Sequence, residues 1–126
     1  MNAPVWLNDI VRDFGRQMAL KDFALNERGA AGLRFENGVN FRLEYAFSSL
    51  MVSTGLEVAV NEGTMKKLLM TAHPSTRSPV KIRAFRLGNE ARFAVRLPER
   101  EVSVTSLQGA FTGLWRITED YRRSIA

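Results

Sequence analysis

Residues 31 to 45 alternate between apolar and polar side chains, and the alternation is interrupted only around Asn37-Gly38. A period of two places successive side chains on opposite faces of a β-strand, so the pattern predicts two paired strands with one buried face. The buried face carries Ala31, Leu33, Phe35, Val39, Phe41, Leu43 and Tyr45. Asn-Gly favours a tight turn, and we expect a three-residue loop with Gly38 in the left-handed region, which sets Phe35 opposite Phe41.

Segments with helical periodicity lie at both ends of the chain. Pro4 suits the first turn of a helix, and apolar side chains then recur at helical spacing up to Met18. This first stripe consists of Trp6, Leu7, Ile10, Val11, Phe14 and Met18. The stripe near the C-terminus consists of Leu107, Phe111, Leu114, Thr118, Tyr121 and Ile125. Both patterns predict amphipathic helices that cover a sheet.

Between these regions the sequence predicts a third strand, a short helix and a second hairpin. The third strand covers residues 50–60, with Gly55 as a possible bulge, and Thr64 caps a helix over residues 65–72. The second hairpin pairs residues 80–87 with 91–97 around Gly88-Asn89, with a bulge at Ala84-Phe85. The resulting order is α-β-β-β-α-β-β-α, a single α+β domain over residues 1–126 with a mainly antiparallel five-stranded sheet.

The composition argues against several classes of protein. The chain has no cysteine, no apolar run near the roughly 20 residues that span a bilayer, and no charged leader followed by a cleavage site. We therefore expect a cytoplasmic protein without membrane insertion. The only histidine, His73, suits a helix end, and no nucleotide-binding or nucleophile motif occurs. We predict no catalytic residue, no metal, no cofactor and no enzymatic activity.

Residues 80–100 hold most of the net charge of +5, with six basic and two acidic residues. In the predicted hairpin Leu87 lies opposite Ala91, so that Arg86 faces Arg92 on the outward side. The side chains predicted to point inward are Ile82, Phe85, Leu87, Phe93, Val95 and Leu97. Two directly opposed arginines repel each other, which predicts a negative group close to them.

Three interpretations of this basic hairpin remain open. The aliphatic stems of the arginines can cover the sheet while their charged heads stay in water. An acidic protein partner can bind them instead. A nucleic acid can bind Arg83, Arg86, Arg92 and Arg96, and this is the alternative function, of a small nucleic-acid-binding or regulatory domain. It ranks last because the aromatic side chains that would stack on bases point inward.

The short helix has apolar side chains on more than one side. Met65, Leu68, Leu69 and Met70 lie on a helix of about eight residues, which is too short to be stable alone. Its own sheet can cover only one of these sides. A subunit interface would cover the rest.

Three stretches of the chain resemble the class I type III secretion chaperones, the Tir-chaperone-like family. They are LNDIVRDFGRQMALKDFALNERGAAGLRFENGVNFRLEY (residues 7–45), MKKLLMTAH (residues 65–73) and SLQGAFTGLWRITEDYRRSIA (residues 106–126). Together they give an amphipathic helix leading into two alternating strands, a short apolar helix after the third strand, and a long terminal helix. The chain departs from this usually acidic family in its pI of about 10.2.

The resemblance implies a cytoplasmic homodimer that binds the N-terminal segment of a secreted effector in extended form and keeps it export-competent. It places the dimer interface on the short helix and the next strand, at Met65, Leu68, Leu69, Val80, Ile82 and Phe85. It places client binding on the first helix and exposed sheet surfaces; with the basic hairpin added, the predicted set is Trp6, Ile10, Leu33, Phe35, Phe41, Arg86 and Arg92. The ATPase of the secretion apparatus is a further expected partner.

Overall fold

The computed structural model describes residues 3–58, 61–71 and 81–125. Its elements are α1 (Val5–Gln17), β1 (Ala30–Arg34), β2 (Val39–Ala46), β3 (Ser49–Glu57), α2 (Glu62–Thr71), β4 (Arg83–Leu87), β5 (Glu90–Pro98), a 3₁₀ turn (Glu99–Glu101) and α3 (Val104–Ile125). The predicted order of helices and strands is confirmed.

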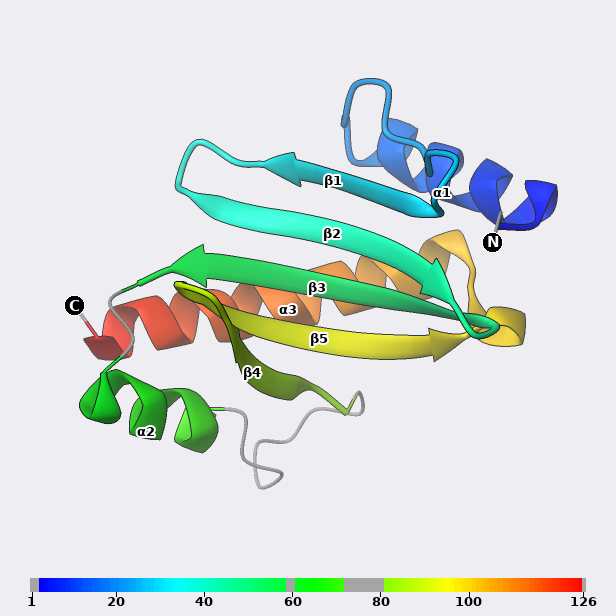
Figure 1. Cartoon of the computed structure of the whole chain (residues 1–126). Helices are drawn as coiled ribbons and strands as arrows, with labels where there is room; N and C mark the ends of the chain where they lie inside the picture. Colours follow the sequence, from blue (N-terminus) through cyan, green and yellow to red (C-terminus); the bar gives the residue numbers. More distant parts are fainter. Residues whose placement is uncertain (1–2, 59–60, 72–80, 126) are drawn as a thin grey trace.

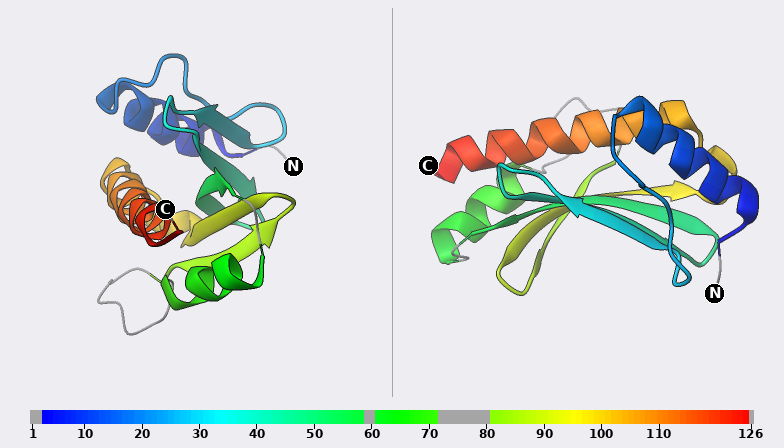
Figure 2. Two further views of the ribbon diagram at one scale, coloured as in Figure 1. Left: turned by 90° about the vertical axis from the view of Figure 1, so that its left-hand side faces the viewer. Right: turned by 90° about the horizontal axis from the view of Figure 1, so that it is seen from above.

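The five strands form one antiparallel sheet in the order β1-β2-β3-β5-β4 (Figure 1). Helices α1 and α3 cover the same face of this sheet, whereas α2 lies beside β4 at one edge (Figure 2). We call the covered face the helix face and the opposite one the outer face. The predicted α+β class is confirmed.

The core lies between the helix face and α3. Because side chains alternate along a strand, the odd-numbered residues of β2 and the even-numbered residues of β3 share this face. The α3 side of the core is formed by Leu107, Ala110, Leu114, Thr118 and Tyr121, all buried. The hydroxyl groups of Thr54 and Thr118 are also buried, and their Oγ1 atoms are joined by a hydrogen bond of 2.7 Å.

Phe41 of β2 lies at the centre of an aromatic cluster on the helix face. Its ring centroid is 6.1 Å from that of Phe14 in α1, 5.9 Å from Phe23 and 4.9 Å from Phe111 in α3. Each such pair adds about 0.5–1.5 kcal/mol beyond the area it buries. The cluster therefore ties α1, α3 and the sheet to residues 19–29, which we call the link.

The link packs directly against α1 at Gly15. A Cβ placed on Gly15 would lie 2.8 Å from the Cβ of Phe23, which is closer than two carbon atoms approach without a shift. A glycine inside a helix is about 1 kcal/mol less favourable than alanine, but here it lets Phe23 reach the cluster. A second contact fixes the link, because the amide of Leu25 donates to Oδ1 of Asn8 at 2.9 Å.

The first hairpin has the predicted loop but not the predicted register. Residues 36–38 form a three-residue loop, with Gly38 at φ 89° and the amide of Phe35 donating to the carbonyl of Val39 at 2.9 Å. Phe35 thus closes the loop with Val39, and Phe41 pairs with Leu33. The prediction that Phe35 lies opposite Phe41 is wrong, because that pairing needs a loop of residues 37–39, whereas the loop consists of residues 36–38.

Strand β3 has no bulge at Gly55. Its pairing with β2 and β5 is continuous through Gly55, which lies between Asn40 and Arg92. The strand ends at Glu57, and residues 59–60, which we expected in it, lie outside the described residues. The glycine serves instead as the place where the Arg92 side chain crosses β3.

Helix α2 begins earlier than predicted, at Glu62. Oδ1 of Asn61 accepts from the amide of Thr64 at 3.0 Å, and Oγ1 of Thr64 accepts from the amide of Asn61 at 2.8 Å. In this reciprocal arrangement Asn61 is the cap and Thr64 lies in the first turn. The prediction that Thr64 caps the helix is wrong, because Asn61 competes for the same position. Ala72, His73 and Pro74 lie outside the described residues.

The close contact at Gly15 predicts opposite effects of alanine at two helical glycines. Gly15→Ala gains about 1 kcal/mol of helix propensity but forces Phe23 away at an overpacking cost of about 1–3 kcal/mol, so the free energy of unfolding falls by up to about 2 kcal/mol. Gly109→Ala in α3 meets no atom within 4 Å and should raise the free energy of unfolding by up to about 1 kcal/mol. Urea denaturation of both variants measures the difference. Equal gains from the two substitutions would contradict the close packing at Gly15.

We predict that the buried phenol of Tyr121 makes the protein less stable at alkaline pH. Its buried hydroxyl donates to the carbonyl oxygen of Thr64 at 3.1 Å, and burial raises the pKa of the phenol above its usual value. The folded chain therefore holds this proton more tightly than the unfolded chain, so the free energy of unfolding falls as pH rises above about 10. The free energy of unfolding of the Tyr121→Phe variant, measured by urea denaturation, should fall less over this pH range. An equal fall in both proteins would show that Tyr121 does not contribute.

Candidate functional site

Strand β4 is turned over relative to the predicted hairpin. Leu87 pairs with Glu90 across a two-residue turn, so Arg86 lies opposite Ala91 and Phe85 lies opposite Arg92. Pairing is continuous from Arg83 to Leu87, without the predicted bulge at Ala84-Phe85. A loop shorter by one residue moves every side chain of a strand to the other face. The predictions that Arg86 faces Arg92, and that Phe85 and Leu87 point inward, are therefore wrong.

Arg92 is buried on the outer face, with 2% of its surface exposed. Its Nη1 donates to Oε2 of Glu90 at 2.6 Å, and its Nη2 donates to Oγ of Ser53 at 2.7 Å. The second carboxylate oxygen of Glu90, Oε1, accepts from the side-chain Nδ2 of Asn40 at 2.8 Å. The side chain of Arg92 lies across Gly55, where an added Cβ would collide with the guanidinium group. The negative group that we expected near Arg92 is thus Glu90 of the same strand.

The predicted basic face is divided. Arg86 is exposed, lies on the other face of the sheet from Arg92, and donates through Nε to the carbonyl of Gly88 at 2.9 Å. Arg83 and Arg96 remain on the outer face, and Nε of Arg96 donates to Oγ of Ser49 at 3.0 Å. A nucleic acid would find no continuous row of four arginines here.

Four of the residues predicted for dimerisation, Met65, Leu68, Ile82 and Phe85, lie in or next to α2 and β4. Leu68 is fully buried in the core of its own chain, Met65 and Ile82 are half-buried against it, and Phe85 is 38% exposed. Val80 and the side chain of Leu69 lie outside what the structure describes. Their role at an interface stays a prediction, and burial leaves Leu68 no surface for a second subunit in this conformation.

The residues predicted for client binding differ in exposure. Trp6 of α1 is 47% exposed, whereas Ile10 is half-buried. Leu33 in β1 and Phe35 just after it are half-buried. The ring of Phe35 packs edge-on against that of Trp115, with 5.1 Å between the ring centroids. Phe41 is fully buried at the centre of the aromatic cluster, so it can support a binding surface only from beneath.

The exposed apolar residues Phe47, Val5 and Met51 were not singled out as exposed from the sequence. Phe47 is 89% exposed in the β2–β3 turn, and it and Ser48 both have positive φ angles, of 51° and 56°. Val5 in the first turn of α1 is also exposed. Ala46 pairs with Ser49, so the turn between β2 and β3 consists of Phe47 and Ser48. Sequence pattern alone gave no signal for the exposure of Phe47, because Phe47 continues the apolar alternation of Phe41, Leu43 and Tyr45.

Among residues 3–58, 61–71 and 81–125, no group of three His, Cys, Asp or Glu side chains is placed to hold a metal ion. Within the same ranges no helix is long and apolar enough to cross a membrane. His73 lies outside them.

Because Arg92 is buried and Arg86 is exposed, we predict that replacing Arg92 lowers the free energy of unfolding much more than replacing Arg86. Arg92→Met removes charge-assisted hydrogen bonds to Glu90 and Ser53, so we expect the free energy of unfolding to fall by about 1.5–3 kcal/mol. Arg86→Met, at an exposed position, should change it by less than about 0.5 kcal/mol. Urea denaturation of the two variants provides the test. Equal small effects would contradict the buried position of Arg92.

Neither a family of proteins nor a curated protein matches the chain in sequence. Solved structures match it in fold. A chain of the ExsC–ExsE complex has a TM-score of 0.75 at 17% identity, over 98% of this chain and 96% of that chain. A chain of the HopA1–SchA chaperone–effector complex has a TM-score of 0.70 at 19% identity, over 91% of both chains.

A third match is to a chain of the complex between the type III secretion chaperone SycH of Yersinia pestis and a fragment of YscM2. The TM-score is 0.65 at 16% identity, over 87% of this chain and 94% of that chain. These matches cover between 87% and 98% of this chain. The chain therefore has the fold of the type III secretion chaperones.

Proposed function

We propose that this chain is a cytoplasmic type III secretion chaperone that binds a secreted polypeptide and keeps it export-competent. The observation that carries the proposal is the likeness, over 91% of both chains, to a chain of a chaperone–effector complex. The even longer match to a chain of the ExsC–ExsE complex supports it, because that structure too holds two proteins together. The proposed role requires no catalysis and no cofactor.

We assign the binding of an extended N-terminal segment of the client to the side of the molecule formed by α1 and β1. Strand β1 is an edge strand, paired on one side only with β2. Its other side offers backbone groups to which an extended peptide can add as a further strand. Half-buried Leu33 alternates with exposed Arg34 along this strand, which leaves room for client side chains on both faces.

Exposed or half-buried apolar side chains supply anchors for the client. Trp6 has the largest exposed ring of the predicted set, and Ile10 follows one turn later in α1. Trp side chains dominate the free energy of many interfaces because they remove a large apolar area from water. The proposal therefore assigns Trp6 a larger share of the binding free energy than Ile10.

The α2 and β4 edge is the proposed dimer interface. Phe85 and Met70 are exposed there, although α2 and β4 contact each other. A second copy that covers them would remove this apolar surface from water. A dimer would hold one client, and the ATPase of the secretion apparatus would receive the complex.

Copurification tests the proposed function. The untagged products of neighbouring genes are coexpressed with the tagged chain, and the mass of the eluted complex is measured by light scattering. We expect one polypeptide to elute with two copies of this chain. A monomer that retains none of these products would contradict both the chaperone role and the dimer.

A matched pair of substitutions tests the assigned client surface. Trp6→Ala should weaken client binding about tenfold, which corresponds to about 1.4 kcal/mol. Leu87→Ala removes another exposed apolar side chain, 52% exposed at the tip of the β4–β5 hairpin, and should leave client affinity unchanged. Titration calorimetry of the purified client measures both. A greater loss with Leu87→Ala would move the binding surface to the β4 side.

A further inference from the structure

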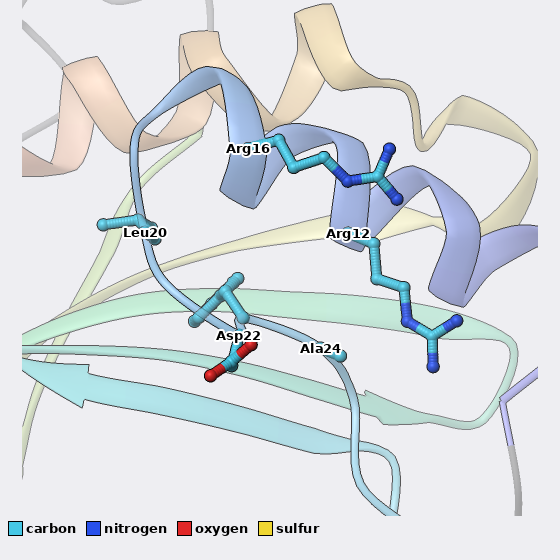
Figure 3. Close-up of a pocket in the computed structure, with 6 residues that line it drawn as sticks. Arg12, Arg16, Leu20, Asp22 and Ala24 are labelled. Carbon is cyan, nitrogen blue, oxygen red and sulfur yellow. The ribbon is translucent and has the colours of Figure 1, made fainter.

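A surface pocket separates α1 from the link. Its volume is about 370 Å³, and Figure 3 shows the side chains that surround it. The lining residues are Arg12, Arg16, Leu20, Asp22, Phe23 and Ala24. The pocket thus combines two guanidinium groups, one carboxylate and three apolar side chains.

Backbone packing fixes the walls of this pocket. Helix α1 ends with the amide of Leu20 donating to the carbonyl of Gly15 at 2.7 Å, and Ala19 takes the left-handed conformation at φ 57°. Phe23 then packs on Gly15, and the amide of Leu25 is held by Asn8. Asp22 is also in the left-handed region, at φ 54°. The link is therefore held at both ends of the pocket.

The two arginines lie on one side of α1, one turn apart, and their like charges repel. Arg16 pairs with Asp13 at 3.1 Å, and both side chains are largely exposed. Within the described part of the chain, Arg12 has no side-chain hydrogen bond or ion pair, either with Asp9 one turn earlier or with Asp22 across the pocket. Figure 3 shows both guanidinium groups extending away from Asp22 in that view. At least one guanidinium at this pocket is thus available to a bound acid.

Guanidinium groups recognise carboxylates through two parallel hydrogen bonds. Leu20 and Ala24 are half-buried lining residues that suit the aliphatic part of the acidic residue or an apolar neighbour in the same peptide, whereas Phe23 is almost fully buried. Charge complementarity favours the same occupant, because the guanidinium group of Arg12 at this pocket has no carboxylate partner within the described part of the chain. A free inorganic anion would bind the arginines but would leave the apolar side chains of the pocket exposed to water.

We propose that Arg12 and Arg16 bind an acidic side chain of the client polypeptide, next to an apolar residue that covers the link. This inference rests on the proposed function, since it names a chemical feature that the client must carry. It makes α1 a determinant of which clients bind. An extended client with a glutamate or aspartate flanked by apolar residues satisfies the pocket.

Nuclear magnetic resonance of the full chain tests this pocket without the client. The probes are acetyl-Leu-Glu-Leu-amide, the matched acetyl-Leu-Gln-Leu-amide and inorganic phosphate, each titrated while the Nε–Hε signals of the arginines are followed. We expect the glutamate peptide to shift the signals of Arg12 and Arg16 at lower concentration than either other probe. Equal shifts from the glutamine peptide would overturn the role of charge. Equal or stronger binding of phosphate would overturn the assignment to a peptide, and no shift with any probe would overturn the pocket as a site.

A matched pair of variants completes the test. Arg12→Gln should raise the Kd of the glutamate peptide about fivefold, whereas Arg116→Gln, at an exposed position of α3, should change it by less than about twofold. Equal effects would show that only the net charge of the chain matters and would overturn the proposal. The copurified client can still bind when the pocket test fails, so the two failures are distinguishable.

Discussion

The contact of Phe23 with Gly15 controls how the N-terminal third of the chain joins the sheet. Because no Cβ lies between them, the link crosses α1 closely enough for Phe23 to stack on Phe41, 5.9 Å away. Phe41 in turn meets Phe111 of α3, so one missing side-chain atom allows α1, the link, β2 and α3 to share a single cluster. The contact of Phe23 with Gly15 also shapes the pocket beside Arg12, since Phe23 is one of the residues that line it. The candidate binding surface and the core are therefore built on one contact.

A second glycine has a similar role on the outer face. Gly55 leaves space for the Arg92 side chain, which binds Glu90 and Ser53 and thereby connects β5 to β3. Glu90 extends this connection to Asn40 of β2. A buried arginine is stable only where every donor has a partner and its charge is compensated. The network therefore favours one register of the three central strands, which places the edges β1 and β4 on opposite sides.

The order of elements was predictable because it depends on periodicity alone, and the apolar stripes of α1 and α3 are long enough to define it. Register depended on the length and the position of each loop, which Asn37-Gly38 and Gly88-Asn89 do not determine. We expected three-residue loops at both hairpins; Gly38 belongs to one, whereas Gly88-Asn89 is a two-residue turn. The difference of one residue reversed the faces of Phe85 and Arg86. The contact between Gly15 and Phe23 could not be predicted from local sequence patterns, because the tertiary fold determines how closely these two residues approach.

Charge counted along the sequence and charge placed in space give different candidate sites. Residues 80–100 hold most of the net charge, yet Arg92 is neutralised by Glu90 and Arg86 lies on the other face of the sheet. Residues 9–22 hold as many acidic as basic side chains and showed no excess charge in the sequence. Helical spacing nevertheless brings Arg12 and Arg16 to one side of α1, and the link adds an apolar surface beside them. In the proposed polypeptide-binding role, such a local combination of charge and apolar surface would determine specificity, since net charge mainly accelerates encounter.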